Sequence, residues 1–391
     1  MITEYSRADI DDYEELIDLA NYVFSHAHKP TDFPTLLPKL YKREYFMDAA
    51  HYLCREDGKI KAAVGAYPLE MKLCGTSLRG RGIGMVSVHP YSRSKGYMRE
   101  LMNRALEDMR KDGMVFSCLD GRRQRYEYFG FSPVGTIFSF ECNSFNIRHT
   151  LDKNVVSSLS LRRLCPKDSA LVEEIRFMHE AKLENGAGFV RRKDRFFDIL
   201  ASWENSVYAV LDGDKFSGYL IYNEKENLIN EVNLKDTGRL AEIINLCLKS
   251  YPPGKTVRVN VHPHETVKLK ALSRFAESFA MEPSYSFNIF NYRSFLEAFV
   301  KLQCSLRNVE DGAFVFEIEN GERLCVRVSG GESTVTEASP PEAAGFKFGP
   351  LEATEFFFSP ITPYASSLIA ENSFLRSLLP LPLFFENADG V

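Results

Sequence analysis

Several features that would place the chain in a special class are missing. The eight cysteines stand singly, without a Cys-x-x-Cys pair, so neither a zinc site nor a disulfide framework is indicated. The sequence shows no signal peptide, and no apolar run reaches the roughly 18–20 residues that span a bilayer. The formal net charge of −5 gives no bulk electrostatic reason to expect nucleic acid. These absences predict a cytoplasmic protein with no metal, no nucleic-acid partner and no membrane partner.

What the sequence does contain is typical of a folded protein with several domains. Hydrophobic residues make up 45% and charged residues 26% of the 391 positions, which is ordinary for globular domains. Because one hydrophobic core rarely serves so long a chain, we expect two or three domains. The Asp-Gly pairs at 57–58 and 212–213, each between two predicted strands, predict tight hairpins. Alternating helices and strands follow each hairpin, which indicates a duplicated α/β unit.

Hydrophobic periodicity predicts the individual elements. In the first third it predicts helices over 10–24 and 94–112, and strands over 51–55, 60–71, 85–88, 115–119 and 136–142. In the middle it predicts strands over 159–164, 207–211, 216–222, 229–234, 257–261 and 285–290, and helices over 168–184, 238–250 and 266–279. The last hundred residues start with a predicted helix over 292–302 and contain the hairpin signal Asn320-Gly321. Apolar residues and two prolines near 380 predict an extended, packed ending.

One segment, 86–98, has the arrangement that a pyrophosphate group requires. It reads Val-Ser-Val-His-Pro-Tyr-Ser-Arg-Ser-Lys-Gly-Tyr-Met and passes from a strand through a short loop into a helix. Unpaired N–H groups at a helix N-terminus attract an anion, Gly96 allows close backbone approach, and Arg93 and Lys95 add positive charge. A solvated loop between a strand and a helix is the ordinary alternative. A dinucleotide-binding fold is disfavoured, because no G-x-G-x-x-G motif follows the first strand.

Two motifs carry a resemblance to a known family. V-x-V-x-P-x-x-R-x-x-G at 86–96 resembles the acetyl-CoA motif of the Gcn5-related N-acetyltransferases (GNAT), and Tyr-Glu-Tyr-Phe-Gly-Phe at 126–131 is similar to a second motif of that superfamily. The whole chain resembles the enhanced-intracellular-survival (Eis) type. This resemblance implies an α/β (α+β) fold, with tandem GNAT folds built on splayed mixed sheets and a C-terminal sterol-carrier-protein-like αβ domain. The implied domains are 1–150 (catalytic), 151–290 (degenerate) and 291–391, whose C-terminus reaches the active site.

The resemblance also implies a reaction and the roles of individual residues. The reaction is acetyl-CoA-dependent N-acetylation of a primary amine, polyamine- or aminoglycoside-like, by direct attack in a ternary complex. Tyr126 is the implied general acid, with Tyr128 as a rival that is out of register, and the carboxylate of Val391 is the implied base. The implied cofactor-binding residues are Val86, Ser87, Val88, Arg93, Ser94, Lys95, Gly96, Tyr97, Met98, Gly121 and Arg122.

The sequence leaves alternatives open at the base and at the acceptor site. The ending 386–391 is also compatible with a disordered polar tip, and Glu386 and Asp389 are then the substitute bases. His26, His28 and Asp32 are candidate substrate contacts, with an ordinary surface loop as the alternative.

Two further expectations concern the middle domain and the assembly. The middle loop at 233–238 lacks Arg-x-x-Gly and contains Asp236, so this domain is predicted to bind no acetyl-CoA. The resemblance implies a hexamer of identical chains. A non-catalytic acyl-CoA- or lipid-binding protein is the alternative function.

Overall fold

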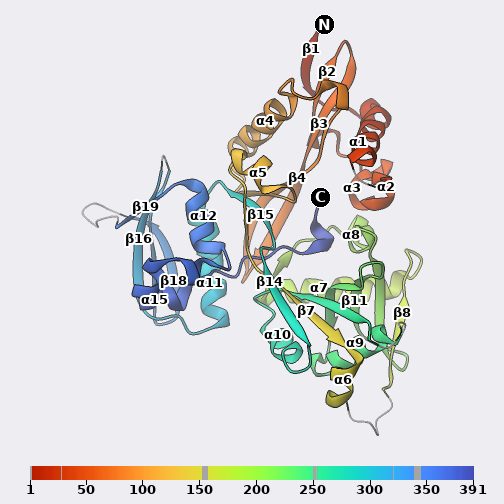
Figure 1. The fold of residues 1–391 in the computed structure, drawn as a ribbon, viewed down its shortest axis with the longest axis vertical. Coiled ribbons are helices and arrows are strands. Elements are labelled where there is room, and N and C mark those ends of the chain that lie inside the picture. Colours follow the sequence, from red (N-terminus) through yellow and green to blue (C-terminus); the bar gives the residue numbers. More distant parts are fainter. Residues whose placement is uncertain are drawn as a thin grey trace.

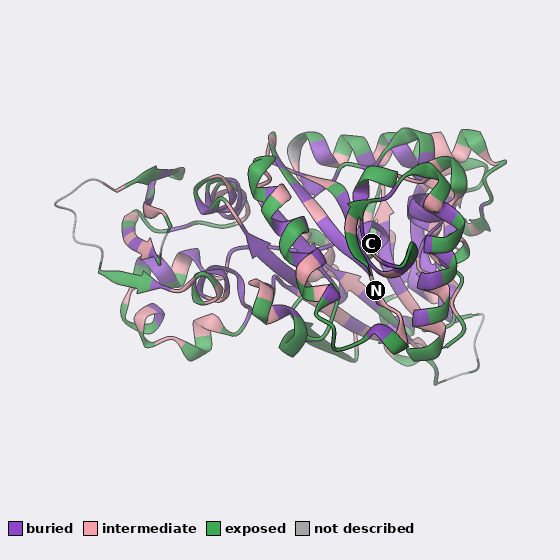
Figure 2. Ribbon diagram, turned by 90° about the horizontal axis from the view of Figure 1, so that it is seen from above, coloured by how far each residue is buried: buried purple, intermediate pink, exposed green. Residues whose placement is uncertain are grey.

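The chain forms three units, each built around its own β-sheet (Figure 1). The computed structural model describes residues 2–27, 29–151, 157–249, 252, 254–319, 321–338 and 345–391. The first unit lies at the top of Figure 1, the second at the bottom and the third at the left. Figure 2 shows that buried residues concentrate on the strands and on the inward faces of the helices. The hydrophobic cores therefore lie between sheet and helices.

The first sheet has the strand order β1-β2-β3-β4-β5-β15-β6, with β9 paired to β3. Its strands are β1 (Thr3–Arg7), β2 (His51–Glu56), β3 (Lys59–Leu73), β4 (Thr76–Val88), β5 (Phe116–Leu119), β6 (Ser132–Val134), β9 (Ala187–Phe189) and β15 (Tyr285–Ile289). Helices α1 (Tyr13–Ala27), α2 (Phe33–Leu36) and α3 (Pro38–Tyr41) cover one face. Helix α4 (Tyr97–Lys111) covers the other face, and α5 (Arg123–Tyr126) follows β5.

The second sheet has the order β14-β7-β13-β12-β11-β10-β8. Its strands are β7 (Ile137–Asn143), β8 (Leu159–Arg163), β10 (Ser206–Asp212), β11 (Lys215–Asn223), β12 (Leu228–Leu234), β13 (Thr256–Val261) and β14 (Ser278–Glu282). Helices α6 (Ser144–Thr150), α9 (Leu240–Leu248) and α10 (Thr266–Leu272) pack on one face. Helices α7 (Ser169–Asn185) and α8 (Phe196–Ala201) pack on the other.

The first two sheets exchange one strand with each other. In the first sheet, β15 lies between β5 and β6, and in the second sheet β7 lies between β13 and β14. The two positions correspond: β15 is the second strand from one edge of the first sheet, and β7 is the second strand from one edge of the second sheet. Strand β7 lies in the second sheet, whereas β9 and β15 lie in the first, so neither sheet is complete without residues from both sides of position 150. The duplicated order predicted from the hairpins is present, and the exchange links the two copies.

The third unit is a small sheet covered by helices, and it shares a core with the first unit. Its strands are β16 (Gly312–Ile318), β17 (Arg323–Ser329), β18 (Glu332–Glu337) and β19 (Phe346–Phe348). Its helices are α11 (Tyr292–Leu306), α12 (Pro350–Phe358), α13 (Thr362–Ala365), α14 (Ser367–Glu371) and α15 (Ser373–Leu378). Phe116 of the first sheet and Phe316 of the third belong to one cluster of buried side chains, so the two units are packed together.

Local signals in the sequence correspond well to the short-range structure. Asp57 and Gly58 both have positive φ, at 48° and 79°, as a tight hairpin between β2 and β3 requires. The predicted helix over 266–279 is wrong beyond residue 272, because the chain instead continues into β14 on the edge of the second sheet. All five residues of β14 are exposed, so no inward-facing apolar alternation marks it as a strand. Asn320 and 339–344 lie outside the described residues.

The C-terminal segment 379–391 is extended and packed, as its composition predicts. Leu381, Leu383, Phe384 and Phe385 are each at most 3% exposed. The backbone N–H of Thr136 donates to Leu383 O at 2.8 Å, which ties the segment to the first unit. The chain then ends between the first and second units (Figure 1).

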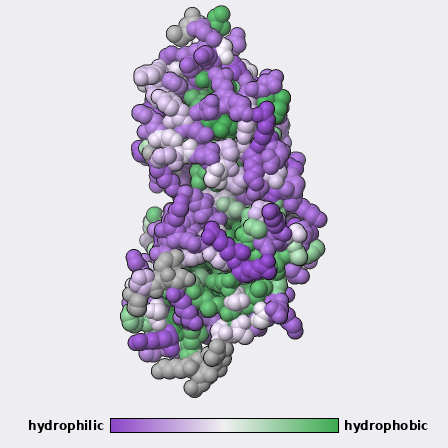
Figure 3. All heavy atoms as spheres, turned by 90° about the vertical axis from the view of Figure 1, so that its right-hand side faces the viewer, coloured by the Kyte–Doolittle hydropathy of each residue, from purple (hydrophilic) through white to green (hydrophobic). Residues whose placement is uncertain are grey.

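One face of the molecule is largely polar (Figure 3). On the face drawn in Figure 3, hydrophilic side chains predominate, and apolar areas interrupt them mainly in the lower half. Across the described ranges, the helices are either too short or too polar to cross a membrane.

Candidate active site

A bulge in β4 opens the first sheet at its centre. Met85 has a φ of 52°, and the β3–β4 register shifts between the pairs Ala63–Ser87 and Gly65–Gly84. On its other side, β4 pairs in parallel with β5 only from Gly80 to Gly82. After Gly82 the two strands diverge, so the backbone amides of the later β4 residues face an opening instead of a neighbouring strand. We call this opening the β4–β5 wedge.

The loop after β4 leads from the wedge to a helix N-terminus. Ser94 and Gly96 both have positive φ, at 66° and 84°, and α4 begins at Tyr97. This backbone turns the first N–H groups of α4 toward solvent, where an anion can accept from them. A cavity of about 770 Å³ runs from the wedge to this helix end. Of the predicted cofactor-binding residues, those that line it are Val86, Val88, Arg93, Ser94, Gly96, Tyr97, Met98 and Arg122.

Three predicted cofactor-binding residues lie elsewhere. Ser87 is 1% exposed and is not among the residues that line the cavity. Lys95 Nζ donates to Glu56 Oε1 at 2.5 Å, and Gly121 lines a smaller cavity of about 360 Å³. The hydrogen bond from Lys95, together with one from Tyr97, lowers the pKa of Glu56 to about 2. The charge of Lys95 is therefore balanced within the protein, and Arg93 and Arg99 are exposed cations beside the helix end.

Tyr126 occupies the last position of α5 and is 7% exposed. Its ring packs so closely over Gly121 that no side chain larger than hydrogen fits there. Burial raises the pKa of Tyr126, which keeps the phenol protonated and able to donate a proton. Tyr128, by contrast, is 75% exposed and lines the large cavity.

The C-terminal residue lies directly on β4. A Cβ built on Gly84 would be 2.8 Å from the carboxylate carbon of Val391, and one on Gly82 would be 2.6 Å from its Cγ2. Only glycine at these positions leaves room for the chain end. Trp203 Nε1 donates to Gly390 O at 3.1 Å, and the hydroxyl of Tyr285 would lie 3.5 Å from a Cβ built on Gly390. The terminal carboxylate is thus held beside the wedge.

Buried ion pairs hold the segment 386–391 against the second unit. Arg191, whose side chain is fully buried, pairs with Asp389 and with Glu231, each at 2.9 Å. Lys182 pairs with Glu386 at 2.9 Å. Burial alone would raise the pKa of Glu386, but Lys182 and Arg191 more than offset it and hold that pKa well below its usual value. We call these five residues the C-terminal latch.

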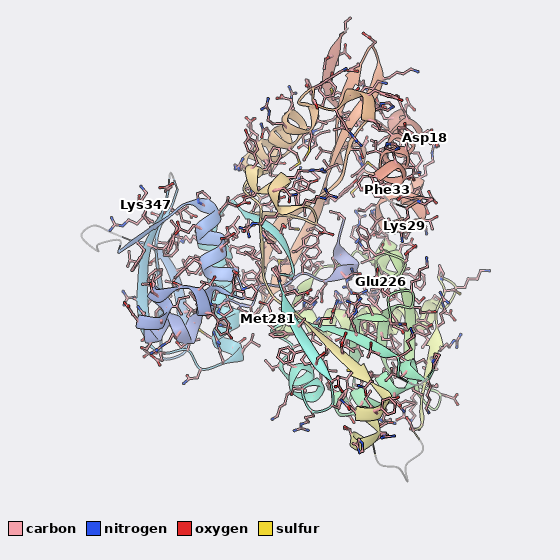
Figure 4. All side chains as sticks on the ribbon, in the orientation of Figure 1. Asp18, Lys29, Phe33, Glu226, Met281 and Lys347 are labelled. Carbon is pink, nitrogen blue, oxygen red and sulfur yellow. The ribbon has the colours of Figure 1, made fainter. Side chains whose placement is uncertain are left out.

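Of the predicted substrate residues, His26 lies at the end of α1 and Asp32 just before α2. His26 is exposed on the last turn of α1, and Asp32 accepts a hydrogen bond from Thr35 Oγ1 at 2.5 Å. Neither lines the cavities described here. His28 lies outside the described residues. Lys29, which Figure 4 labels, lies in the same region and pairs with Glu204 of the second unit at 3.1 Å.

Sequence reasoning missed Arg191, Tyr285, Trp203 and Lys39, all of which contact the chain end. Trp203 is the single tryptophan of the chain, a composition signal that was available. The other three carry no local motif, because their partners lie far away in the sequence.

The second sheet repeats the opening but not the anion site. Its β12 and β13 pair in parallel only at Leu228–Arg258 and Ile229–Val259. At the following helix end, Asp236 Oδ1 accepts from the N–H of Gly238 at 2.9 Å. A carboxylate of the chain thus caps this helix start, whereas no carboxylate side chain caps the N-terminus of α4 in the first unit.

Comparison with known proteins agrees with this geometry. Residues 4–134 match the family model of the acetyltransferase (GNAT) domain. The first unit is a GNAT acetyltransferase domain. A GNAT domain implies an acyl-CoA cosubstrate, and the wedge, the α4 N-terminus and the cavity between them fit an elongated molecule with a phosphate group. No curated protein sequence matches the chain.

Several solved structures share the fold over nearly the full length. A GCN5-related N-acetyltransferase from Anabaena variabilis is 14% identical, with 98% of each chain covered and a TM-score of 0.67. A conserved protein of unknown function from Enterococcus faecalis, a probable N-acyltransferase, is 17% identical, with 91% of this chain and 89% of that chain covered and a TM-score of 0.64. Eis1 from Mycobacterium abscessus is 12% identical, with both chains covered completely and a TM-score of 0.63. These matches confirm the predicted fold class and the Eis-like architecture.

Proposed function

We propose that the chain is an acetyl-CoA-dependent N-acetyltransferase that acetylates a primary amine by direct attack in a ternary complex. The observation that carries this proposal is the terminal carboxylate lying on β4 beside the wedge of a GNAT domain. A base and a cofactor channel at the same opening allow both substrates to meet there. Polyamines and aminoglycosides are the acceptors that the resemblance to Eis-type enzymes favours, and a hexamer is the assembly that it favours.

In this proposal the protein handles two protons while one acetyl group moves. The Val391 carboxylate accepts a proton from the ammonium, so that the amine can attack the thioester carbon. The backbone N–H groups of Val86–Val88 stabilise the negative charge that develops on the carbonyl oxygen. As the C–N bond forms and the C–S bond breaks, Tyr126 donates its proton to the departing sulfur. The products are an N-acetyl amine and free CoA thiol.

The remaining residues in this proposal bind the cofactor or hold the chain end. Arg93 and the N-terminus of α4 bind the pyrophosphate, with Ser94, Gly96 and Met98 shaping the loop. The domains in this proposal are 1–150, 151–290 and 291–391 along the chain, with β7 of the first range in the second sheet and β9 and β15 of the second range in the first. The middle domain binds no acetyl-CoA, because Asp236 already caps its helix end.

The test separates binding from chemistry. Acetyl-CoA is expected to raise the thermal midpoint of the wild type by mass action, and Arg93→Glu is expected to abolish this shift. Lys167→Glu, the same charge reversal at an exposed loop of the second unit, is the control and should keep the shift. Tyr126→Phe should keep the shift and lose release of free thiol with an amine acceptor. An absent shift in the wild type would contradict the proposed function, and a shift without turnover on any amine would favour a non-catalytic acyl-CoA-binding protein.

A further inference from the structure

The ring of Tyr67 lies over the last pair of residues before the bulge in β4. Gly65 on β3 and Gly84 on β4 are opposite each other, and the register shift of β4 follows directly after this pair. A Cβ built on Gly65 would be 2.5 Å from the hydroxyl oxygen of Tyr67, and one built on Gly84 would be 3.3 Å from its Cε2. The ring therefore fills the space that two opposing side chains would take, at the point where β4 leaves its register.

The same ring lies beside the chain end. The Cβ built on Gly84 would also be 2.8 Å from the carboxylate carbon of Val391. Val391 packs against the cluster of buried side chains that contains Tyr67, and both residues line a small cavity of about 70 Å³. One glycine position thus separates the ring from the carboxylate, so a movement of the ring changes the space that the carboxylate can occupy.

Two hydrogen bonds hold the hydroxyl of Tyr67 inside the core. One joins it to His51 Nε2 at 2.9 Å, and the other joins it to the hydroxyl of Tyr41 at 2.6 Å. His51 Nδ1 donates in turn to Met47 O at 2.9 Å. Tyr41, His51 and Tyr67 are each at most 1% exposed, so the loss of either bond leaves a buried polar group without this partner. The hydroxyl is accordingly fixed from two sides, by α3 and by β2.

The groups that form these hydrogen bonds carry no charge. Burial lowers the pKa of His51 to about 4, so its ring is neutral near pH 7. Burial also raises the pKa of the Tyr67 hydroxyl well above its usual value, so this group keeps its proton. Removing the hydroxyl therefore takes no charge away from the surroundings of the terminal carboxylate, and any effect on that carboxylate comes through position.

A second tyrosine of the same core shows what is particular to Tyr67. Tyr13 is 7% exposed, and its hydroxyl donates to Tyr41 O at 2.7 Å. Its ring packs against Phe46 at a centroid distance of 5.1 Å. Tyr13 is not among the nearest neighbours of the Gly84 position, and it does not line the cavity that contains Val391. Both tyrosines stabilise this core, and of the two it is Tyr67 that borders the chain end.

We propose that Tyr67 is a positioning residue whose hydrogen-bonded ring keeps the bulge of β4 open and holds the Val391 carboxylate at the β4–β5 wedge. The inference rests on the proposed function for its effect on turnover, whereas its effect on the place of the chain end is independent of that function. A displacement of about 1 Å at a reacting group can lower a rate by about 100-fold. A loosened ring should therefore slow the reaction without weakening cofactor binding.

The first experiment removes the hydroxyl and keeps the ring. Tyr67→Phe is expected to lower kcat with an amine acceptor about tenfold, while the KM of acetyl-CoA stays within about twofold, because Arg93 and the N-terminus of α4 are untouched. Tyr13→Phe removes a buried hydroxyl from the same core and should leave both constants unchanged. An unchanged kcat in Tyr67→Phe, or an equal loss in the two variants, would overturn the inference.

The pH dependence of the same variant separates positioning from proton transfer. Since the hydrogen-bonded groups around Tyr67 are neutral, the ratio of the wild-type kcat to that of Tyr67→Phe should be constant between about pH 6.5 and pH 8.5. A ratio that changes with pH would mean that the hydroxyl carries a proton in the reaction, which contradicts a positioning role.

A second variant leaves Tyr67 itself intact. Tyr41→Phe removes one of the two hydrogen bonds and is expected to lower kcat about threefold. Because the Tyr41 hydroxyl acts through Tyr67, the double variant should be no slower than Tyr67→Phe alone, and losses that multiply would contradict the inference. If Tyr67→Phe does not fold, Tyr41→Phe still decides, since an unchanged kcat would overturn the role of the hydroxyl.

Removal of the terminal valine tests the same placement without any turnover. Carboxypeptidase Y should release Val391 from Tyr67→Phe about tenfold faster than from the wild type, as followed by the mass of the intact protein, because the chain end detaches more often. Tyr13→Phe should match the wild type. If no amine releases thiol but this difference is observed, the proposed function fails and the role of Tyr67 stands. Equal rates of release from Tyr67→Phe and the wild type would overturn that role.

Discussion

Arg191 offers the sharpest test of how the chain end is held. Its guanidinium is buried and contacts Asp389 and Glu231 at 2.9 Å and Glu386 at 3.6 Å. Arg191→Met keeps much of the side-chain volume but leaves these buried carboxylates without their shared cation. Breaking a buried ion pair by removing one partner costs about 3–5 kcal/mol of folding free energy.

The pH dependence of this loss has a definite sign. In the wild type, Glu231 and Glu386 have pKa values below their usual range, because Arg191 and Lys182 outweigh the cost of burial. These two groups therefore stabilise the fold above about pH 4.5, and this contribution is lost as pH falls through their folded pKa values. Without Arg191 burial prevails and raises both values. The loss of stability in Arg191→Met is accordingly greatest near pH 7 and shrinks toward pH 5.

Thermal unfolding at pH 7 and pH 5 measures both effects. At roughly 2 °C per kcal/mol, Arg191→Met should lower the thermal midpoint by roughly 6–10 °C at pH 7. Arg192→Met is the matched control, since Arg192 is the next residue, is 62% exposed at its side chain and pairs with Asp194 on the surface. A surface pair contributes about 0–1 kcal/mol, so the control should change little. Equal midpoints for the two variants at pH 7 would refute the role assigned to the latch.

Three further predictions concern the chain end and its surroundings. Gly84→Ala places a Cβ 2.8 Å from the Val391 carboxylate carbon, so it should lower turnover at least about tenfold while the acetyl-CoA thermal shift is preserved. Gly345→Ala is the control, because nothing lies within 4 Å of its Cβ, and it should change neither turnover nor the thermal shift. One glycine added after Val391 displaces the carboxylate, and unchanged turnover would exclude it as the base. Burial lowers the pKa of Lys39 from 10.5 to about 7, so the stability of the wild type should rise with pH between these two values. Thermal midpoints measured across this range should show no such rise in Lys39→Met. A rise that persists in the variant would contradict Lys39 as its source.

The local features of the site were readable from the sequence. The hairpin at 57–58, the strand–loop–helix passage at 86–98 and the packed ending each depend on residues close together in the chain. Glycine tolerates positive φ, a helix exposes N–H groups at its start, and prolines with apolar residues favour a packed, non-helical ending. These rules need no knowledge of the rest of the fold. The same local reasoning failed at 278–282, where exposed residues become a strand because β7 offers a partner.

Tertiary structure decided how these pieces become a candidate active site. Arg191 and Asp389 are 198 positions apart, and Lys39 and Ala388 are 349 apart. No periodicity links such residues, because their contact depends on the exchange of β7 and β15 and on the path of segment 379–391 across both units. The sequence by itself determined a GNAT-type wedge and an ordered chain end. The packing of the three sheets brought Val391 onto Gly84. The physical reason is that Arg191 and Lys182 of the second unit pair with Asp389 and Glu386 and so hold the chain end against the first sheet.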